Sequence, residues 1–134
     1  MEYVIGIVLG IAVGVSTSLV GMDRDRALYP AILIVVASYY ALFAVMAGAN
    51  NALIVESAVG LIFVILAFAG FRSTLWLTVA GLAGHGIFDF FHGGIIHNPG
   101  VPVYWMGFCL SIDIVLAAYL SWLITFDRIR PITS

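Results

Sequence analysis

Residues 52–70 read ALIVESAVGLIFVILAFAG, a run in which Glu56 is the only charged residue. A helix needs about 20 consecutive, mostly apolar residues to cross the hydrocarbon core of a bilayer. The whole 134-residue chain has the same character, because 63% of its residues are apolar and only 9% are charged. Soluble domains have roughly 45–50% apolar and about 25% charged residues. The composition therefore predicts an integral membrane protein that is surrounded by the lipid bilayer.

Four further apolar segments flank this run, and each is long enough to cross the bilayer. The predicted spans are about residues 3–20, 31–49, 52–70, 74–94 and 104–126. Short polar or Pro/Gly-containing turns separate them, which leaves room for one bundle and no separate soluble domain. We therefore predict an all-α, polytopic bundle of about five transmembrane helices that forms a single domain over residues 1–134. A four-helix bundle is the alternative, if the fourth segment ends early as a re-entrant segment.

The distribution of basic residues predicts how this bundle is oriented. The chain has no lysine, and its five arginines lie after the first, third and fifth spans, at Arg24, Arg26, Arg72, Arg128 and Arg130. Short cytoplasmic loops carry the Lys/Arg excess of membrane proteins. We therefore expect the N-terminus outside, the C-terminus in the cytoplasm, and a multi-pass location in the cell (inner) membrane. Scattered arginines form no basic patch, so nucleic-acid binding is not expected.

Ionisable residues inside the spans lie away from the arginines. At about 100° per residue, Asp89 is about 40° from His85, and His92 is about 20° from it on the other side. These three residues therefore share one narrow stripe of the fourth span. At about 1.5 Å per residue, His85 and Asp113 lie near the midplane, while His92 and Glu56 lie near the outer surface. The pattern predicts a polar column that runs from the midplane toward the outer face.

Such residues need partners, since an acid at the centre of a membrane helix costs about 2.5–3.5 kcal/mol on insertion scales. No arginine is placed to pair with them, which leaves the histidines, a metal ion, water or one another. Histidine and aspartate supply nitrogen and oxygen ligands, which suit zinc and also iron or manganese. We predict a divalent metal site, with zinc favoured, whose ligands are His85, Asp89, His92 and Asp113. Glu56 and Asp89 are the predicted catalytic residues, with Glu56 handling protons.

A metal site with an open coordination position activates water. The leading hypothesis is therefore a metal-dependent, hydrolase-like enzyme, with its site open to the outer face and an amphipathic substrate. The alternative is a non-enzymatic small subunit of a membrane complex, or an oligomeric proton or ion transporter that uses the same acids. A purely structural role is the third hypothesis, in which the histidines pair with the acids and hold the helices together.

Gly6, Gly10 and Gly14 in the first span have the four-residue spacing that lets another helix approach closely. They predict either packing within the bundle or a contact with another chain, as a homo-oligomer or in a larger membrane complex. In the second span, Tyr39 and Tyr40 are interpreted as packing residues, although a hydroxyl is within reach of the polar column.

The C-terminal part of the chain resembles a family of small bacterial integral membrane proteins of unknown function. The shared pattern is His-x3-Asp-x2-His, a proline-containing loop and Cys-x3-Asp, here His85, Asp89, His92, Pro99, Pro102, Cys109 and Asp113. Phe88 stands where the family often has tryptophan, and Gly93 stands where it often has a second histidine. The resemblance covers roughly the last third of the chain. It implies a shared site and names no activity.

Overall fold

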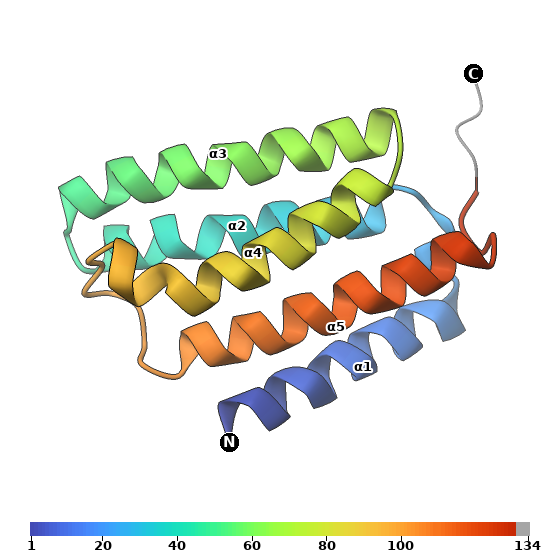
Figure 1. Cartoon of the computed structure of the whole chain (residues 1–134), viewed down its shortest axis with the longest axis horizontal. Coiled ribbons are helices and arrows are strands. Elements are labelled where there is room, and N and C mark those ends of the chain that lie inside the picture. The colour runs from blue at the N-terminus through green and yellow to red at the C-terminus, as the bar shows by residue number, and fades with distance from the viewer. Residues whose placement is uncertain (131–134) are drawn as a thin grey trace.

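The computed structural model describes residues 1–130, which form five long α-helices lying side by side (Figure 1). The helices are α1 (Glu2–Val20), α2 (Leu28–Met46), α3 (Asn50–Arg72), α4 (Trp76–Ile95) and α5 (Trp105–Thr125), with a short 3-10 helix, η1 (Met22–Arg24), before α2. Successive helices run in opposite directions, so the turns that carry arginine lie at one end, called the arginine end below. The all-α prediction is thereby confirmed. The last four residues of the predicted domain, 131–134, lie outside the described residues.

Each predicted span corresponds to one helix, and the largest difference in position is at α2. The sequence predicted a start after Pro30, whereas α2 begins at Leu28. Proline is tolerated in the first turn of a helix, because the N–H groups there have no intrahelical partner. At its other end α2 stops at Met46, and Gly48 then turns the chain with a φ of 65°.

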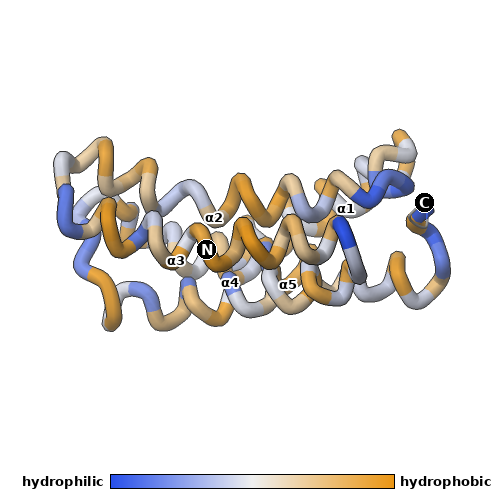
Figure 2. The backbone as a smooth tube through the Cα atoms, turned by 90° about the horizontal axis from the view of Figure 1, so that it is seen from above, coloured by the Kyte–Doolittle hydropathy of each residue, from blue (hydrophilic) through white to orange (hydrophobic). Residues whose placement is uncertain are grey.

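Within the described residues, four helices are long and apolar enough to cross a membrane, namely α1, α2, α3 and α5. α4 is also 20 residues long, but with two histidines and one aspartate it is not among these four. Figure 2 shows hydrophilic residues gathered at the two ends of the bundle and hydrophobic ones along its length. These features indicate a multi-pass helical membrane protein. Which end faces the cytoplasm stays a prediction.

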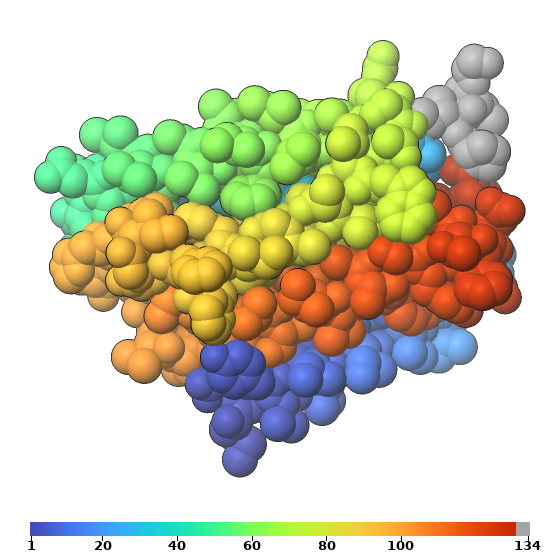
Figure 3. All heavy atoms as spheres, in the orientation of Figure 1, coloured from blue at the N-terminus to red at the C-terminus, as the bar shows by residue number. Residues whose placement is uncertain are grey.

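α4 and α5 hold the bundle together. α5 packs against α1 on one side and α4 on the other, while α2 pairs with α3, and α4 contacts both of them. On the face drawn in Figure 3, α3, α4, α5 and α1 therefore follow one another as neighbouring layers. The apolar core lies between α2, α3, α4 and α5, with fully buried side chains that include Leu33, Ala67, Leu82, Leu116 and Leu120.

The glycine stripe of α1 packs against α5 of the same chain. Gly6, Gly10 and Gly14 are the buried residues of α1. A Cβ atom at Gly6 would lie 2.5 Å from the Phe108 carbonyl oxygen, and one at Gly10 would lie 2.9 Å from Cβ of Val115. The backbones approach this closely only because the side chains are absent. The stripe is thus used for internal packing, and any homo-oligomer would use another surface.

This packing predicts that Gly6→Ala destabilises the protein. The added methyl group meets a backbone carbonyl, so α1 and α5 must move apart, at a cost of about 1–3 kcal/mol. We expect a lower unfolding temperature in detergent, measured by circular dichroism. Gly94→Ala on α4 is the matched control, because a Cβ atom there meets nothing within 4 Å. Equal unfolding temperatures for Gly6→Ala and the unchanged protein would contradict the close contact between α1 and α5.

Candidate functional site

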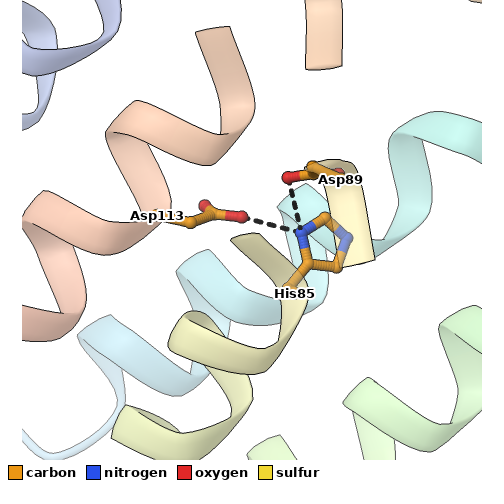
Figure 4. A group of neighbouring side chains, drawn as sticks. All are labelled: His85, Asp89 and Asp113. Carbon is orange, nitrogen blue, oxygen red and sulfur yellow. Dashed lines mark hydrogen bonds and ion pairs between the residues drawn. The ribbon is translucent and has the colours of Figure 1, made fainter. Parts of the chain in front are cut away.

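Three ionisable side chains converge where α4 packs on α5, and they are called the inner group: His85, Asp89 and Asp113 (Figure 4). His85 and Asp89 are one turn apart on α4, so they share a face. His85 Nδ1 lies 2.7 Å from Asp113 Oδ2 and 3.4 Å from Asp89 Oδ2. Gly86 faces α5 at this level, where a Cβ atom would make an ordinary van der Waals contact of 3.4 Å with Cβ of Asp113. One ligand atom from each residue lies within 4.8 Å of the others.

The inner group is buried and carries more acid than base. Asp89 and Asp113 are 0% exposed and His85 is 1% exposed. Within residues 1–130, the ion pairs of these two acids are with His85 and not with an arginine. Asp89 Oδ2 and Asp113 Oδ1 have no hydrogen-bond partner among the described residues. An unpaired buried carboxylate oxygen is costly. The two oxygens therefore favour a bound cation or a proton at this position.

A second set of side chains, the outer group, lies farther from the arginine end: Glu56, His92 and Asn98. His92 Nε2 lies 2.5 Å from Glu56 Oε1, and the Asn98 amide donates to the same oxygen at 3.0 Å. The structure thus brings three of the four predicted metal ligands together in the inner group. The fourth, His92, forms a hydrogen bond with Glu56 instead. Glu56, a predicted catalytic residue, is engaged by His92 and Asn98 rather than by the inner group.

Tyr40 on α2 contacts both groups. Its hydroxyl donates a hydrogen bond of 2.5 Å to Asp89 Oδ1. Its ring stacks on the imidazole of His92, with centroids 4.0 Å apart and planes 9° apart. Its backbone carbonyl accepts from the Asn98 amide at 3.0 Å. Sequence reasoning interpreted Tyr40 as a packing residue, because α2 is apolar on all sides and gives no sign of which tyrosine faces α4.

The segment between α4 and α5 covers the outer group. Gly100 lies against α2, where a Cβ atom would overlap the Phe43 carbonyl oxygen. The Gly100 N–H donates to Asn98 Oδ1 at 3.1 Å, which orients the amide toward Glu56. The sequence predicted a site open to the outer face, whereas the structure buries Glu56 and His92, which are each 2% exposed, so that opening stays a prediction. Asn98 was missed, because the sequence shows only a loop residue between His97 and Pro99.

A narrow crevice between α2, α3 and α4 separates the two groups. Glu56 and His85 both line it, together with Tyr40, Phe63 and Phe88. It has no room for a water molecule. The edge of the Phe63 ring packs on His85, with ring centroids 4.8 Å apart. The two polar groups are therefore neighbours in a dry, aromatic surrounding.

A wider opening, called the α2–α5 groove, lies between α2 and α5 and has a volume of about 340 Å³. Its walls are apolar and include Val35, Tyr39, Trp105 and Phe108. Cys109 lies at its base and is 2% exposed. Because Cys109 precedes Asp113 by one turn on the same face of α5, the groove reaches within about one turn of the inner group.

In comparisons with known proteins, no family model, curated protein or solved structure matches the chain. The resemblance to small bacterial membrane proteins therefore stays a prediction. What the site does must be argued from its own geometry.

Because the Tyr40 hydroxyl donates a hydrogen bond to Asp89, we predict that removing this hydroxyl lowers the stability of the folded protein. Tyr40→Phe leaves Asp89 Oδ1 without its donor and should destabilise the protein by about 1–3 kcal/mol. Tyr39→Phe is the matched control, since Tyr39 is only half-buried and packs on Phe43 and Trp105. Thermal unfolding in the same detergent measures both variants. Equal losses in the two variants would contradict a specific bond between Tyr40 and Asp89.

Proposed function

We propose that the inner group binds one divalent metal ion through His85, Asp89 and Asp113. The observation that supports this most directly is the convergence of three buried ligand atoms within 4.8 Å of one another. The two carboxylate oxygens that lack hydrogen-bond partners, Asp89 Oδ2 and Asp113 Oδ1, supply free lone pairs at this point. One imidazole nitrogen with carboxylate oxygens suits zinc, and also iron or manganese.

Charge balance favours a bound cation over two buried aspartates, Asp89 and Asp113, without one. A dication would neutralise two carboxylates where the membrane and the protein exclude water, and where an isolated charge is expensive. The Tyr40 hydroxyl holds Asp89 Oδ1, so that the other oxygen of that carboxylate faces His85. Hydrogen bonds of this kind orient the ligands in metal sites and tune their basicity.

We propose that the protein is a metal-dependent, hydrolase-like membrane enzyme. Three protein ligands leave a coordination position free, which is typical of catalytic rather than structural zinc sites. A divalent ion bound there supplies Lewis-acid chemistry, including the activation of water. Glu56 remains the proposed proton-handling residue, because it borders the same crevice as His85 and its Oε2 has no partner among the described residues.

The substrate is proposed to be amphipathic and to enter sideways from the bilayer. The segment between α4 and α5 closes the outer end of the site, whereas the α2–α5 groove opens beside Cys109. An apolar groove that ends near a polar site favours a molecule with an apolar chain and a hydrolysable polar group. That this closed end of the bundle lies on the outer side of the membrane also belongs to the proposal.

A proton or ion path, the alternative, is less well supported. Within residues 1–130 the hydrogen bonds of the inner group end at Tyr40, and those of Glu56 involve His92 and Asn98. The crevice between the groups has no room for the water that would bridge them. A purely structural role makes the opposite prediction from a metal site, since it requires no ion.

Metal content of the detergent-purified protein tests the proposal. We expect about one zinc, iron or manganese per chain by elemental mass spectrometry, and loss of the ion in His85→Ala and Asp113→Asn. His92→Ala should keep the ion, because His92 binds Glu56. His97→Ala is the control for a histidine that is exposed in the loop. A chelator should lower the unfolding temperature of the unchanged protein and leave that of His85→Ala unchanged.

Two results would contradict the metal site. One is a protein without metal after it is supplied with each of the three ions and washed. The other is an ion that His85→Ala and Asp113→Asn both retain while circular dichroism shows folded helices. If the ion is present, hydrolysis of lipid substrates by the loaded protein, compared with Glu56→Gln, tests the enzymatic part of the proposal.

A further inference from the structure

A separate cavity lies at the arginine end, and it is called the arginine pocket. It has a volume of about 480 Å³ and lies between the α1–α2 turn and the segment that follows α5. Arg24 and Arg130 line it, with Asp25 and the apolar residues Met22 and Leu28. The Arg130 N–H donates to the Arg24 carbonyl oxygen at 3.0 Å, which brings the two arginine-bearing segments together.

Positive charge prevails in this pocket. Neither Arg24 nor Arg130 forms an ion pair within residues 1–130. Asp23 is buried and accepts a hydrogen bond from Ser18, so it does not face the pocket. Asp25 is on the wall, and its Oδ1 accepts from the Ala27 N–H at 3.0 Å. Two arginines and one aspartate therefore line the pocket, which gives it a net positive charge.

Two other arginines near this end have partners in the protein. Arg26 donates to the carbonyl oxygens of Gly70, Phe71 and Ser73 at the end of α3, at 3.2–3.3 Å. Arg128 lies over the Trp122 ring, 5.6 Å from its centroid. Arg24 and Arg130 thus differ from both in lining a cavity large enough for a ligand.

The arginine pocket adjoins the α2–α5 groove. Leu28 and Ala31 line both cavities. From Leu28 to Tyr39, the part of α2 that borders the groove rises about 16 Å. Half of a hydrocarbon core of about 30 Å is nearly the same length. An apolar groove one leaflet deep thus begins at a positively charged pocket.

We propose that the groove and the arginine pocket together bind one anionic phospholipid. Its phosphate lies between Arg24 and Arg130, and one acyl chain follows the groove along α2 toward Tyr39. Guanidinium groups bind phosphate oxygens with two parallel hydrogen bonds, and arginines near the membrane surface attract anionic lipids. This site uses none of the metal ligands and stands whether or not the inner group binds a metal.

Native mass spectrometry of the full chain in a neutral detergent tests this site. The probes are phosphatidylglycerol and phosphatidylcholine with the same acyl chains. We expect the unchanged protein to bind phosphatidylglycerol more tightly, by about fivefold for each arginine. Arg24→Gln combined with Arg130→Gln should remove this preference. Arg72→Gln is the matched control, because it removes a positive charge from the same end but outside the pocket.

The groove is tested in the same way. Ala31→Phe places a ring on the wall shared by both cavities and should weaken binding of both lipids. Ile65→Phe, at an exposed position of α3, should leave both unchanged. His85→Ala should keep the preference for phosphatidylglycerol, so a failure of the metal proposal is distinguishable from a failure of this one.

Three results would overturn the lipid site. The first is equal binding of the two lipids by the unchanged protein, and the second is a preference that survives loss of both arginines. The third is a dimer that binds neither lipid preferentially, which would show that a second copy covers the pocket. Circular dichroism of each variant confirms that its helices are intact before binding is compared.

Discussion

Two aspartates and one histidine share a dry space between α4 and α5, and the charge balance in that space constrains the structure around it. His85 is the basic side chain that contacts both acids within the described residues. In a low-dielectric interior, Asp89 and Asp113 are tolerated only where hydrogen bonds, a proton or a cation offset the cost of desolvation. The contact between α4 and α5 therefore depends on charge as well as on packing.

The residues around the inner group form a second layer that comes from other parts of the chain. Tyr40 reaches from α2 to Asp89 and stacks on His92, while Asn98 reaches from the segment before α5 to Glu56. This layer closes the end of the bundle that is far from the arginines. A substrate would therefore reach the inner group from the lipid-facing side of the bundle, through the apolar groove between α2 and α5. The same groove leads to the arginine pocket, so one lipid-facing surface joins the two proposed sites.

Much of the fold follows from the sequence because the bilayer leaves few alternatives. A backbone in hydrocarbon must satisfy its own hydrogen bonds, so each apolar run of about 20 residues predicts one helix. α4 was predicted as the fourth span, although it is not among the four described helices that are apolar enough to cross a membrane. Helical periodicity also placed His85 and Asp89 on one stripe, and depth placed Asp113 at their level. The largest displacement was at α2, which starts and ends three residues earlier than predicted, because Pro30 fits inside a helix start as well as before it.

The sequence by itself determined the helices, the depth of each polar residue and the face it occupies on its own helix. Only the tertiary structure decided which polar residues meet. His92 shares the stripe of His85, yet it binds Glu56, because that turn of α4 meets the Glu56 carboxylate of α3. For Tyr40 the sequence indicated only that a hydroxyl was within reach of the polar column, and for Asn98 it gave no sign. The physical reason is rotation about the helix axis: a helix such as α2, apolar on every side, carries no pattern that shows which face meets its neighbour.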